Sequence, residues 1–491
     1  MVELHELPAL TQRELLTQGT ISPVELTKHY LERVELLNPR IHALTTVTPE
    51  RALDRARQLE DDSRDRGRPT RHDSPLWGMP FADKDLNDRA GVTSTYGSRL
   101  TADYMAGASS PIVVDMDEAG GVSLGKTNVP EFGFPAYGEN LLPDGSARNP
   151  WDLARDPGGS SSGAAASVAG QMLPFAPGND AGGSIRIPAS ACGLVGLKPT
   201  RGRVPGESGI ASLAGLAVGG PLGRSVGDVA LLLDGMVSGP NRYALRAPND
   251  LGLPASGSYV DGLGGQPRPL RIGWNTWSPW STNYEIEVDR EVNQVFEEAL
   301  SAAVEMGHTV EHVEPSPAPT YFESFRTVWM ASAASLPFPD AALDALEPLT
   351  AWLVRKGRTR PAADLPGALA ALKQFEAQII ADYLHYDLIL TPLLAMTPRP
   401  IGWFDASDGE RNFMQQCQFT PFTSYVNVAG LPALSMPVGM SAGVSGSESP
   451  LPIGVQAIGR SGQESTLLRF ALDMEKRFGW DTRVPPVVSG V

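Results

Sequence analysis

The sequence has few cysteines, no excess of positive charge and no long apolar run, and each shortage excludes a class of protein. Only two cysteines occur among 491 residues, Cys192 and Cys417, which are too few for a disulfide framework and lack the spacing of a zinc site. With 40 Lys and Arg against 56 Asp and Glu, the net charge is −16, so no overall positive field attracts nucleic acid or anionic lipid. We therefore expect no metal, no cofactor, no nucleic-acid or membrane partner, and a neutral small molecule as the ligand.

The first residues also lack targeting features. Residues 1–7 are acidic rather than basic, and they contain no apolar run of the kind found in a signal peptide or a membrane span. Since so few cysteines suit a reducing compartment, the sequence predicts a soluble, cytoplasmic protein, and we expect a monomer or a homodimer.

Helix and strand signals alternate along the chain and indicate an α/β fold. Residues 22–25, Ser-Pro-Val-Glu, are typical of a capped helix start, and Asn38-Pro39 is expected to stop that helix. A second helix is expected near residues 52–59.

The C-terminal half carries further strand signals. A strand at residues 270–274, the amphipathic helix after it and a short strand around Val310 form a βαβ unit. A buried strand is expected at residues 387–392, and residues 433–438 and 453–458 flank a loop rich in glycine, serine and proline, which is typical of a strand pair. We therefore predict a central twisted mixed β-sheet covered by helices on both faces.

Two glycine-serine runs, at residues 158–163 and 180–186, lie downstream of a lysine, Lys84. Two serines and a lysine supply a nucleophile, a proton carrier and a base without any histidine. A glycine-rich backbone also lets several NH groups converge on one point, as an oxyanion developing on a carbonyl requires. The combination predicts an acyl-transfer enzyme.

A phosphate-binding loop is one alternative. Residues 120–127 match the pattern G-x-x-x-x-G-K-T and would make the protein a nucleotide hydrolase that depends on Lys126. Such a loop follows a strand and opens a helix, whereas here residues 112–119 have a helical pattern and Pro130 interrupts the segment after the lysine. We prefer a strand at residues 122–124 that leaves the sheet into a loop.

A nucleophile elbow is the other alternative. Residues 159–163 match G-x-S-x-G, which nominates Ser161 for a Ser-His-Asp hydrolase. That elbow follows a hydrophobic strand, and residues 153–158 do not resemble one. The downstream histidines lie in no evident motif: His308, His312 and His385. We therefore expect Ser161 to support the site rather than to act as its nucleophile.

Taken together, the separated motifs resemble the amidase signature family. The matching blocks follow the family's order over most of the chain, at residues 78–85, 125–128, 148–151, 157–163, 178–189, 192–200, 427–433 and 452–456. The resemblance implies a single amidase domain over residues 1–491. Within it, residues 1–70 form N-terminal helices, residues 71–235 form the core with the catalytic residues, and residues 236–491 complete the sheet and the substrate pocket.

The resemblance also implies a Ser-cisSer-Lys triad that hydrolyses a C–N bond through an acyl-enzyme or carbamoyl-enzyme intermediate. By position, Ser184 is the nucleophile, Ser160 is the bridging serine on a cis peptide, and Lys84 is the base. A lysine removes a serine proton near neutral pH only when its amine is neutral, so we expect Lys84 to be buried and neutral. Ser160 both donates and accepts, and would pass the proton between the other two.

The backbone around the nucleophile is expected to hold the developing negative charge. The predicted donors of this oxyanion hole are the NH groups of Ala181, Gly182, Gly183 and Ser184. Asp180 and Arg186 flank this loop, and two interpretations of them stay open. They form either a hydrogen-bonded pair that orients the loop or an ordinary surface ion pair.

Two further comparisons bear on the substrate. Subunits of glutamine-dependent amidotransferases resemble the same fold, but a glutamine usually follows their Ser-Ile-Arg where this chain has Ile187, so that activity is kept as the alternative. Residues 178–193 and 426–430 are more similar to the branch that hydrolyses nylon oligomers, aryl amides and carbamates. This similarity implies an amidase with urethanase capacity and a roomy, apolar pocket. The aromatic residues in 321–329 and 413–425 either line that pocket or belong to the core.

Overall fold

The fold is built on two β-sheets. The computed structural model describes residues 2–143, 145–204, 212–238, 249–250, 252–265, 268–442 and 449–488. Within them, a three-stranded sheet has the order β1-β3-β2 and an eight-stranded sheet has the order β4-β6-β5-β10-β11-β9-β7-β8. The strands are β1 Leu44–Val47, β2 Pro80–Lys84, β3 Val122–Thr127, β4 Phe175–Asp180, β5 Val195–Lys198, β6 Val218–Gly223, β7 Arg271–Trp274, β8 Thr309–His312, β9 Leu388–Pro392, β10 Ala433–Met440 and β11 Pro452–Gly459.

Helices surround these sheets. The α-helices are α1 Ala9–Gln18, α2 Pro23–Ile41, α3 Pro49–Arg66, α4 Pro111–Glu118, α5 Ser162–Ala169, α6 Arg186–Cys192, α7 Val226–Met236, α8 Tyr259–Gly262, α9 Arg290–Glu305, α10 Tyr321–Ala334, α11 Pro348–Thr359, α12 Asp364–Tyr383, α13 Gly409–Phe419, α14 Ser424–Ala429 and α15 Glu464–Phe478. Short 3-10 helices are η1 Leu4–Glu6, η2 Arg99–Thr101, η3 Glu131–Gly133, η5 Leu213–Gly215, η6 Pro279–Thr282, η7 Asp340–Ala345 and η8 Trp480–Thr482.

The large sheet is mixed, as the sequence predicts. β7 pairs in parallel with both β8 and β9, whereas β10 pairs antiparallel with β5 and with β11. Because α9 connects the parallel strands β7 and β8, the predicted βαβ unit is confirmed. The predicted strand pair is confirmed as β10 and β11, and residues 443–448 of the loop between them lie outside the described residues.

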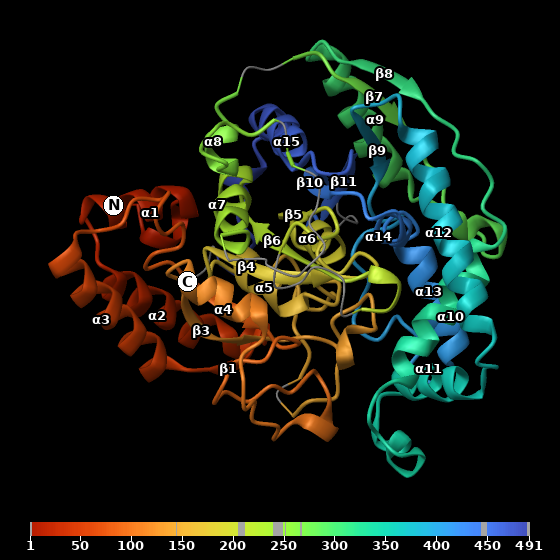
Figure 1. The fold of residues 1–491 in the computed structure, drawn as a ribbon, viewed down its shortest axis with the longest axis horizontal. Coiled ribbons are helices and arrows are strands. Elements are labelled where there is room, and N and C mark those ends of the chain that lie inside the picture. Colours follow the sequence, from red (N-terminus) through yellow and green to blue (C-terminus); the bar gives the residue numbers. More distant parts are fainter. Residues whose placement is uncertain are drawn as a thin grey trace.

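Helices cover both faces of this sheet (Figure 1). On one face, α15 packs against β10 and β11 and also contacts α7 and α9. On the other face, α6 packs against β5, β10 and β11, and α5 lies beside it against β4. Helices α1 to α3 lie at one end of the molecule, and α10 to α13 lie at the opposite end.

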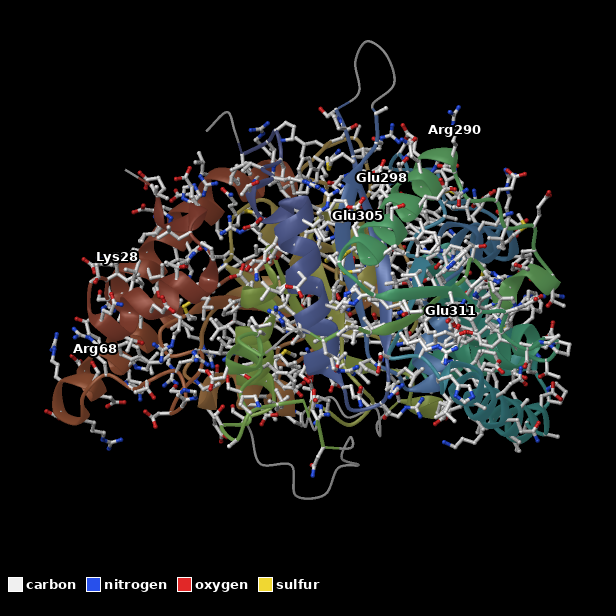
Figure 2. All side chains as sticks on the ribbon, turned by 90° about the horizontal axis from the view of Figure 1, so that it is seen from above. Lys28, Arg68, Arg290, Glu298, Glu305 and Glu311 are labelled. Atoms are coloured by element: carbon white, nitrogen blue, oxygen red, sulfur yellow. The ribbon has the colours of Figure 1, made fainter. Side chains whose placement is uncertain are left out.

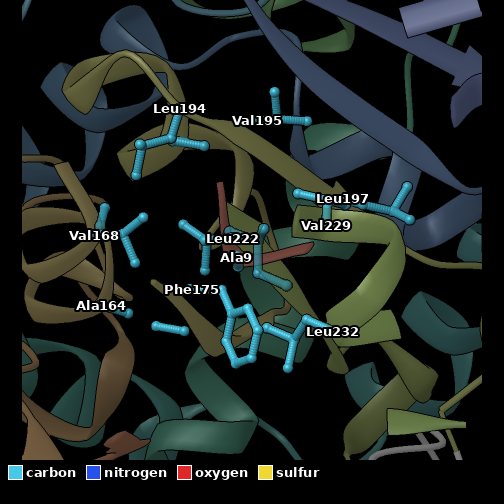
Figure 3. Close-up of a cluster of buried hydrophobic side chains, with 14 of the residues drawn as sticks. Ala9, Ala164, Val168, Phe175, Leu194, Val195, Leu197, Leu222, Val229 and Leu232 are labelled. Atoms are coloured by element: carbon cyan, nitrogen blue, oxygen red, sulfur yellow. The ribbon is translucent and has the colours of Figure 1, made fainter. Parts of the chain in front are cut away.

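An apolar cluster fixes α5 and β4 in place. Helix α5 begins within the first glycine-serine run, and strand β4 ends at the start of the second. In Figure 3, Val168 of α5 and Leu232 of α7 lie on either side of Phe175 of β4 and Leu222 of β6. All four side chains are fully buried. Burying a side chain of this size contributes about 1.5–3 kcal/mol, so the cluster holds the helix and the strand in a defined relation.

Many charged side chains lie at the surface, although some, such as Lys126, are buried. Figure 2 shows Lys28, Arg68 and Arg290 extending outward from the ribbon. In the described parts of the chain, no helix is both long enough and apolar enough to cross a membrane.

Helix α2 begins as predicted but ends later. The Ser22 side chain accepts from the Glu25 NH at 3.1 Å, and the Glu25 carboxylate accepts from the Ser22 NH at 2.8 Å. The helix does not stop at Asn38-Pro39 but runs through Pro39 to Ile41. A proline in the last turn removes only one backbone hydrogen bond, and the fully buried Ile41 side chain holds that turn against the core.

Residues 120–127 do not form a phosphate-binding loop. They follow α4, and Gly125 and Lys126 lie inside β3. This strand includes residues 122–124, where the sequence predicted one. Lys126 is fully buried, with its Nζ 3.4 Å from Asp85 Oδ1 and 3.1 Å from Ser94 Oγ. A lysine held in this way inside a strand is not placed to cradle a phosphate, so the nucleotide-hydrolase alternative is wrong.

The close packing of α5 gives a first prediction. A Cβ on Gly163 would lie 2.2 Å from the Ala43 carbonyl oxygen and 2.3 Å from the Asn128 nitrogen. We expect Gly163→Ala to lower the Tm, because overpacking against rigid backbone costs about 1–3 kcal/mol and outweighs the gain of about 1 kcal/mol in helix propensity. Differential scanning fluorimetry measures the change.

Gly367→Ala is the matched control, because Gly367 lies in α12 and a Cβ added to it would have nothing within 4 Å. This variant gains helix propensity without a clash, so its Tm is expected to stay the same or to rise. A Tm for Gly163→Ala at or above that of Gly367→Ala would contradict the close packing of α5.

Candidate active site

Three separate segments bring Lys84, Ser160 and Ser184 into one region. Lys84 is the last residue of β2, Ser160 precedes α5, and Ser184 lies in the loop between β4 and α6. Lys84 Nζ donates to Ser160 Oγ at 3.0 Å. Ser161, the residue after Ser160, donates its backbone NH to the Ser184 carbonyl at 3.1 Å. This bond joins the two segments that carry the serines.

The three side chains differ in their access to solvent. Lys84 is fully buried, as the sequence predicts, and also donates to the Asn179 carbonyl at 3.2 Å. Ser160 is 2% exposed and follows a cis peptide bond from Gly159, the conformation that the family resemblance implies. Ser184 is 8% exposed and lines a cavity. Of the three, Ser184 is therefore the one that a ligand in that cavity would contact.

The loop at residues 181–184 uses one of the predicted oxyanion donors for its own structure. Gly183 donates its NH to Asp180 Oδ1 at 2.7 Å. Nothing in the described part of the chain accepts a hydrogen bond from the NH of Ala181, Gly182 or Ser184. Of the four predicted donors, these three NH groups therefore have no acceptor among the described residues, whereas the NH of Gly183 is already bound to Asp180.

Asp180 and Arg186 form a buried ion pair at the base of this loop. Arg186 Nε donates to Asp180 Oδ2 and Nη2 donates to Oδ1, each at 3.0 Å. Both residues are fully buried, so the surface-pair interpretation is wrong. Burial by itself raises the pKa of the Asp180 carboxyl, but the Arg186 guanidinium outweighs burial and holds that pKa well below its usual range.

The C-terminal part of the chain satisfies the remaining donors of Arg186. Its Nη1 donates to Gln456 Oε1 at 2.6 Å and to the Thr423 carbonyl at 3.1 Å, and its Nη2 donates to Asn427 Oδ1 at 2.6 Å. Asn427 Nδ2 in turn donates to Asp180 Oδ1 at 2.8 Å. Asn427 and Gln456 fall in two of the motif blocks, but the motifs alone did not predict what they contact.

The structure does not support the elbow alternative, because in the described ranges no histidine hydrogen-bonds to Ser161. Ser161 is fully buried, and its Oγ is 3.4 Å from the Asn179 carbonyl. His308 and His312 lie at β8, the edge of the large sheet opposite to β4, and His385 lies just before β9. Ser161 instead supports the site through its backbone bond to Ser184.

The cavity beside Ser184 has a volume of about 60 Å³ and walls that are mostly apolar. Its aromatic residues are Phe134, Trp280, Phe325, Trp329 and Phe413. The apolar character agrees with expectation, but the cavity is small rather than roomy. Among the described residues, no charged side chain lines it.

The aromatic residues at 321–329 and 413–425 divide between the cavity and the core. Phe325 and Trp329 stack at 5.5 Å between ring centroids and lie on the wall. Tyr321 and Tyr425 are buried within a hydrophobic cluster. Both interpretations from the sequence therefore hold, each for different residues.

Both cysteines are buried and unpaired. Burial raises the pKa of each thiol. Cys192 lies in the main core cluster, whereas Cys417 lines the cavity. Over the described ranges, no group of three or more His, Cys, Asp or Glu residues is arranged to hold a metal ion.

Comparison with known proteins gives matches along almost the whole chain. The family model described as Amidase matches residues 25–468. A Mycobacterium tuberculosis protein named "Putative amidase AmiB2" is 33% identical over 484 residues, which cover 98% of each chain. The A subunit of a glutamyl-tRNA(Gln) amidotransferase from Acinetobacter baumannii is 31% identical over 510 residues, again covering 98% of each.

Solved structures are similar over the same length. The 6-aminohexanoate cyclic dimer hydrolase complexed with substrate is 29% identical, with a TM-score of 0.86 over 99% of this chain and 100% of that one. A bacterial aryl acylamidase is 24% identical, with a TM-score of 0.81 over 99% of each chain, and this second match bears on the fold alone.

The buried ion pair gives a second prediction. Arg186→Met leaves the Asp180 carboxylate buried without its cation, and removing one partner of such a pair costs about 3–5 kcal/mol. We therefore expect a large decrease in Tm, measured by scanning calorimetry near neutral pH.

The same pair predicts the sign of a pH dependence. Because folding lowers the pKa of Asp180, the stability that the pair contributes is fully present above the ordinary aspartate pKa of about 3.9 and is lost as the pH falls toward the depressed value. The difference in Tm between wild type and Arg186→Met should therefore shrink below about pH 4. A difference that stays constant from about pH 7 down to about pH 3 would contradict the charged pair.

Proposed function

The chain belongs to the amidase family, and we propose that it hydrolyses the C–N bond of uncharged amides, including aryl amides and aryl carbamates, through Ser184, Ser160 and Lys84. The observation that carries the proposal is the 3.0 Å contact between Lys84 and Ser160, buried behind a serine that lines an apolar cavity. In the proposal, Ser184 at the cavity is the nucleophile, Ser160 carries the proton and the buried Lys84 is the base.

In the proposed first step, Ser184 Oγ attacks the substrate carbonyl. Its proton passes to Ser160, whose own hydroxyl proton moves to the neutral Lys84 amine over the 3.0 Å contact. A serine hydroxyl accepts and donates at the same time, so Ser160 transfers the proton without changing its own charge. Ser184 is thereby activated without a histidine.

In the second step, the tetrahedral oxyanion collapses and the C–N bond breaks. The NH groups of Gly182 and Ser184 are the proposed donors to the oxyanion, with Ala181 beside them. Lys84 returns the proton through Ser160 to the leaving amine, which departs and leaves the acyl group on Ser184. Water then attacks this ester by the same proton path and releases the acid.

The walls of the cavity support an uncharged substrate. An ionised group that enters an apolar site without a partner loses its hydration and gains nothing in return. Aromatic rings such as Phe325 and Trp329 instead favour flat apolar groups, through offset or edge contacts. An aryl amide or aryl carbamate matches the apolar, aromatic character of these walls, and the related hydrolase acts on a cyclic dimer of 6-aminohexanoate.

The amidotransferase alternative rests on the relative that is 31% identical. Free glutamine carries an ammonium and a carboxylate, and the described lining offers no charged side chain to either. Ile187 contributes an apolar side chain to the lining. Amidotransferase subunits usually have a glutamine at this position. Ammonia release from glutamine is therefore expected to be absent, and release at a rate comparable with amide hydrolysis would favour the alternative.

The proposal also covers the cellular compartment, the oligomeric state and the binding partner of the enzyme. Two buried, unpaired cysteines are compatible with a reducing compartment, so we place the enzyme in the cytoplasm, as a monomer or homodimer. The net charge of −16 favours a small molecule over nucleic acid as its partner.

Substitution of the nucleophile or the base gives a third prediction. Ser184→Ala and Lys84→Met should each lower kcat at least about 1,000-fold while the protein stays folded, because such groups act as one catalytic unit. The measurement is release of the aromatic amine from a matched aryl amide and aryl carbamate.

Covalent trapping tests directly whether Ser184 is the nucleophile. A fluorophosphonate should add one adduct to wild type, located on Ser184 by mass spectrometry, and none to Ser184→Ala. Ser332→Ala is the matched control, because its hydroxyl bonds to the Val328 carbonyl within α10. This control should keep both labelling and turnover. Turnover by a folded Ser184→Ala variant would contradict the proposal.

A further inference from the structure

We infer that Thr423 is a positioning residue of the oxyanion loop, residues 181–184. The Thr423 hydroxyl fixes the Gly182–Gly183 peptide and thereby aims the NH groups on either side of that peptide. The inference rests on the proposed function, because it assigns a role within the same site. Thr423 lies just before α14, about 240 residues along the chain from the loop that it holds.

The contact between Thr423 and the loop is short and buried. Thr423 Oγ1 donates to the Gly182 carbonyl at 2.6 Å, and Thr423 is fully buried. The other end of the same peptide group is also held, since the Gly183 NH donates to Asp180 Oδ1 at 2.7 Å. In a trans peptide these two groups point in opposite directions, so the two bonds together prevent the plane from rotating.

A neighbouring threonine sets the direction of the Thr423 hydroxyl. Thr420 Oγ1 lies 2.8 Å from Thr423 Oγ1. Each hydroxyl has one hydrogen, and the hydrogen of Thr423 is already donated to Gly182. Thr420 must therefore be the donor in this contact, and it lines the cavity. A directed chain of hydrogen bonds runs from the cavity wall to the loop.

The next peptide along the loop is held separately. The Gly183 carbonyl accepts from the Ile187 NH at 2.7 Å, in the first turn of α6. This bond directs the Ser184 NH away from α6, because it belongs to the same trans peptide. Without the Thr423 hydroxyl, the peptide before Gly183 keeps only the bond to Asp180. The NH groups of Gly182 and Ser184 then lose their fixed relative direction.

The approach of Thr423 also explains the glycine at position 183. A Cβ on Gly183 would lie 2.5 Å from Thr423 Oγ1 and 2.8 Å from Thr423 Cβ, and its φ is +133°. Both the contact and the backbone conformation require glycine there. The loop and Thr423 therefore fit each other as a pair.

The experiment compares Thr423→Val, which removes the hydroxyl at nearly constant volume, with Thr423→Ser, which keeps it. On an aryl amide that wild type cleaves, Thr423→Val should lower kcat at least about tenfold and leave KM within about twofold, because oxyanion donors act in the transition state. Thr423→Ser should restore most of that loss. Thr466→Val, a half-buried threonine on α15, is the matched control and should leave both parameters unchanged.

Inhibitor binding separates positioning from a general structural effect. An aryl trifluoromethyl ketone forms an oxyanion with the nucleophile, so its inhibition constant should rise in Thr423→Val by about the same factor as kcat/KM falls. The corresponding alcohol, which lacks the carbonyl, should bind both proteins equally. If Thr423→Val does not fold, Thr423→Cys, with a weaker donor, is expected to show the same loss confined to kcat.

Two outcomes would overturn the inference. One is wild-type kcat in a folded Thr423→Val, and the other is a loss that appears only in KM. Neither is confused with failure of the proposed function, because retained turnover in Ser184→Ala marks that failure. An inactive Ser184→Ala together with a fully active Thr423→Val would reject the role of Thr423 alone.

Discussion

The buried ion pair between Asp180 and Arg186 is the constraint on which the site depends. Two charges are withdrawn from water here, and that is tolerated only when their hydrogen-bonding groups find partners. Asp180 accepts from the NH groups of Gly183 and Ile185 and from Asn427, so the carboxylate shapes the loop that carries Ser184. The loop therefore takes its shape from a charge that does not itself react.

The partners of this pair come from distant parts of the chain, which couples assembly of the site to assembly of the fold. Gln456 lies on β11 and Asn427 on α14, yet both hydrogen-bond to the pair at the base of the β4–α6 loop. The loop around Ser184 therefore has all of these hydrogen-bond partners only when the C-terminal part lies against the large sheet. Residues 71–235 carry Lys84, Ser160 and Ser184 but not all of the groups that hold the loop around Ser184.

The range of each interaction explains which features the sequence predicted and which it could not. Lys84, Ser160 and Ser184 could be proposed because each lies in a short motif of distinctive composition, and the mixed sheet was predicted because its strands have local signals. Thr423 was missed, since its contact with Gly182 joins residues far apart in sequence. The internal bond of Gly183 and the small size of the cavity were missed because both arise only once the chain has folded and its side chains have packed together.

Overall identity does not distinguish the substrates of related chains here, because this protein is 29% identical to a cyclic dimer hydrolase and 31% identical to an amidotransferase subunit. The charge of the cavity wall discriminates more strongly than its shape. Leaving an ionised group unpaired in an apolar site costs several kcal/mol, whereas a misfitted methylene costs only about 1–3 kcal/mol. Under the proposed function, the uncharged wall disfavours zwitterions first, and the aromatic rings then select among neutral amides by fit.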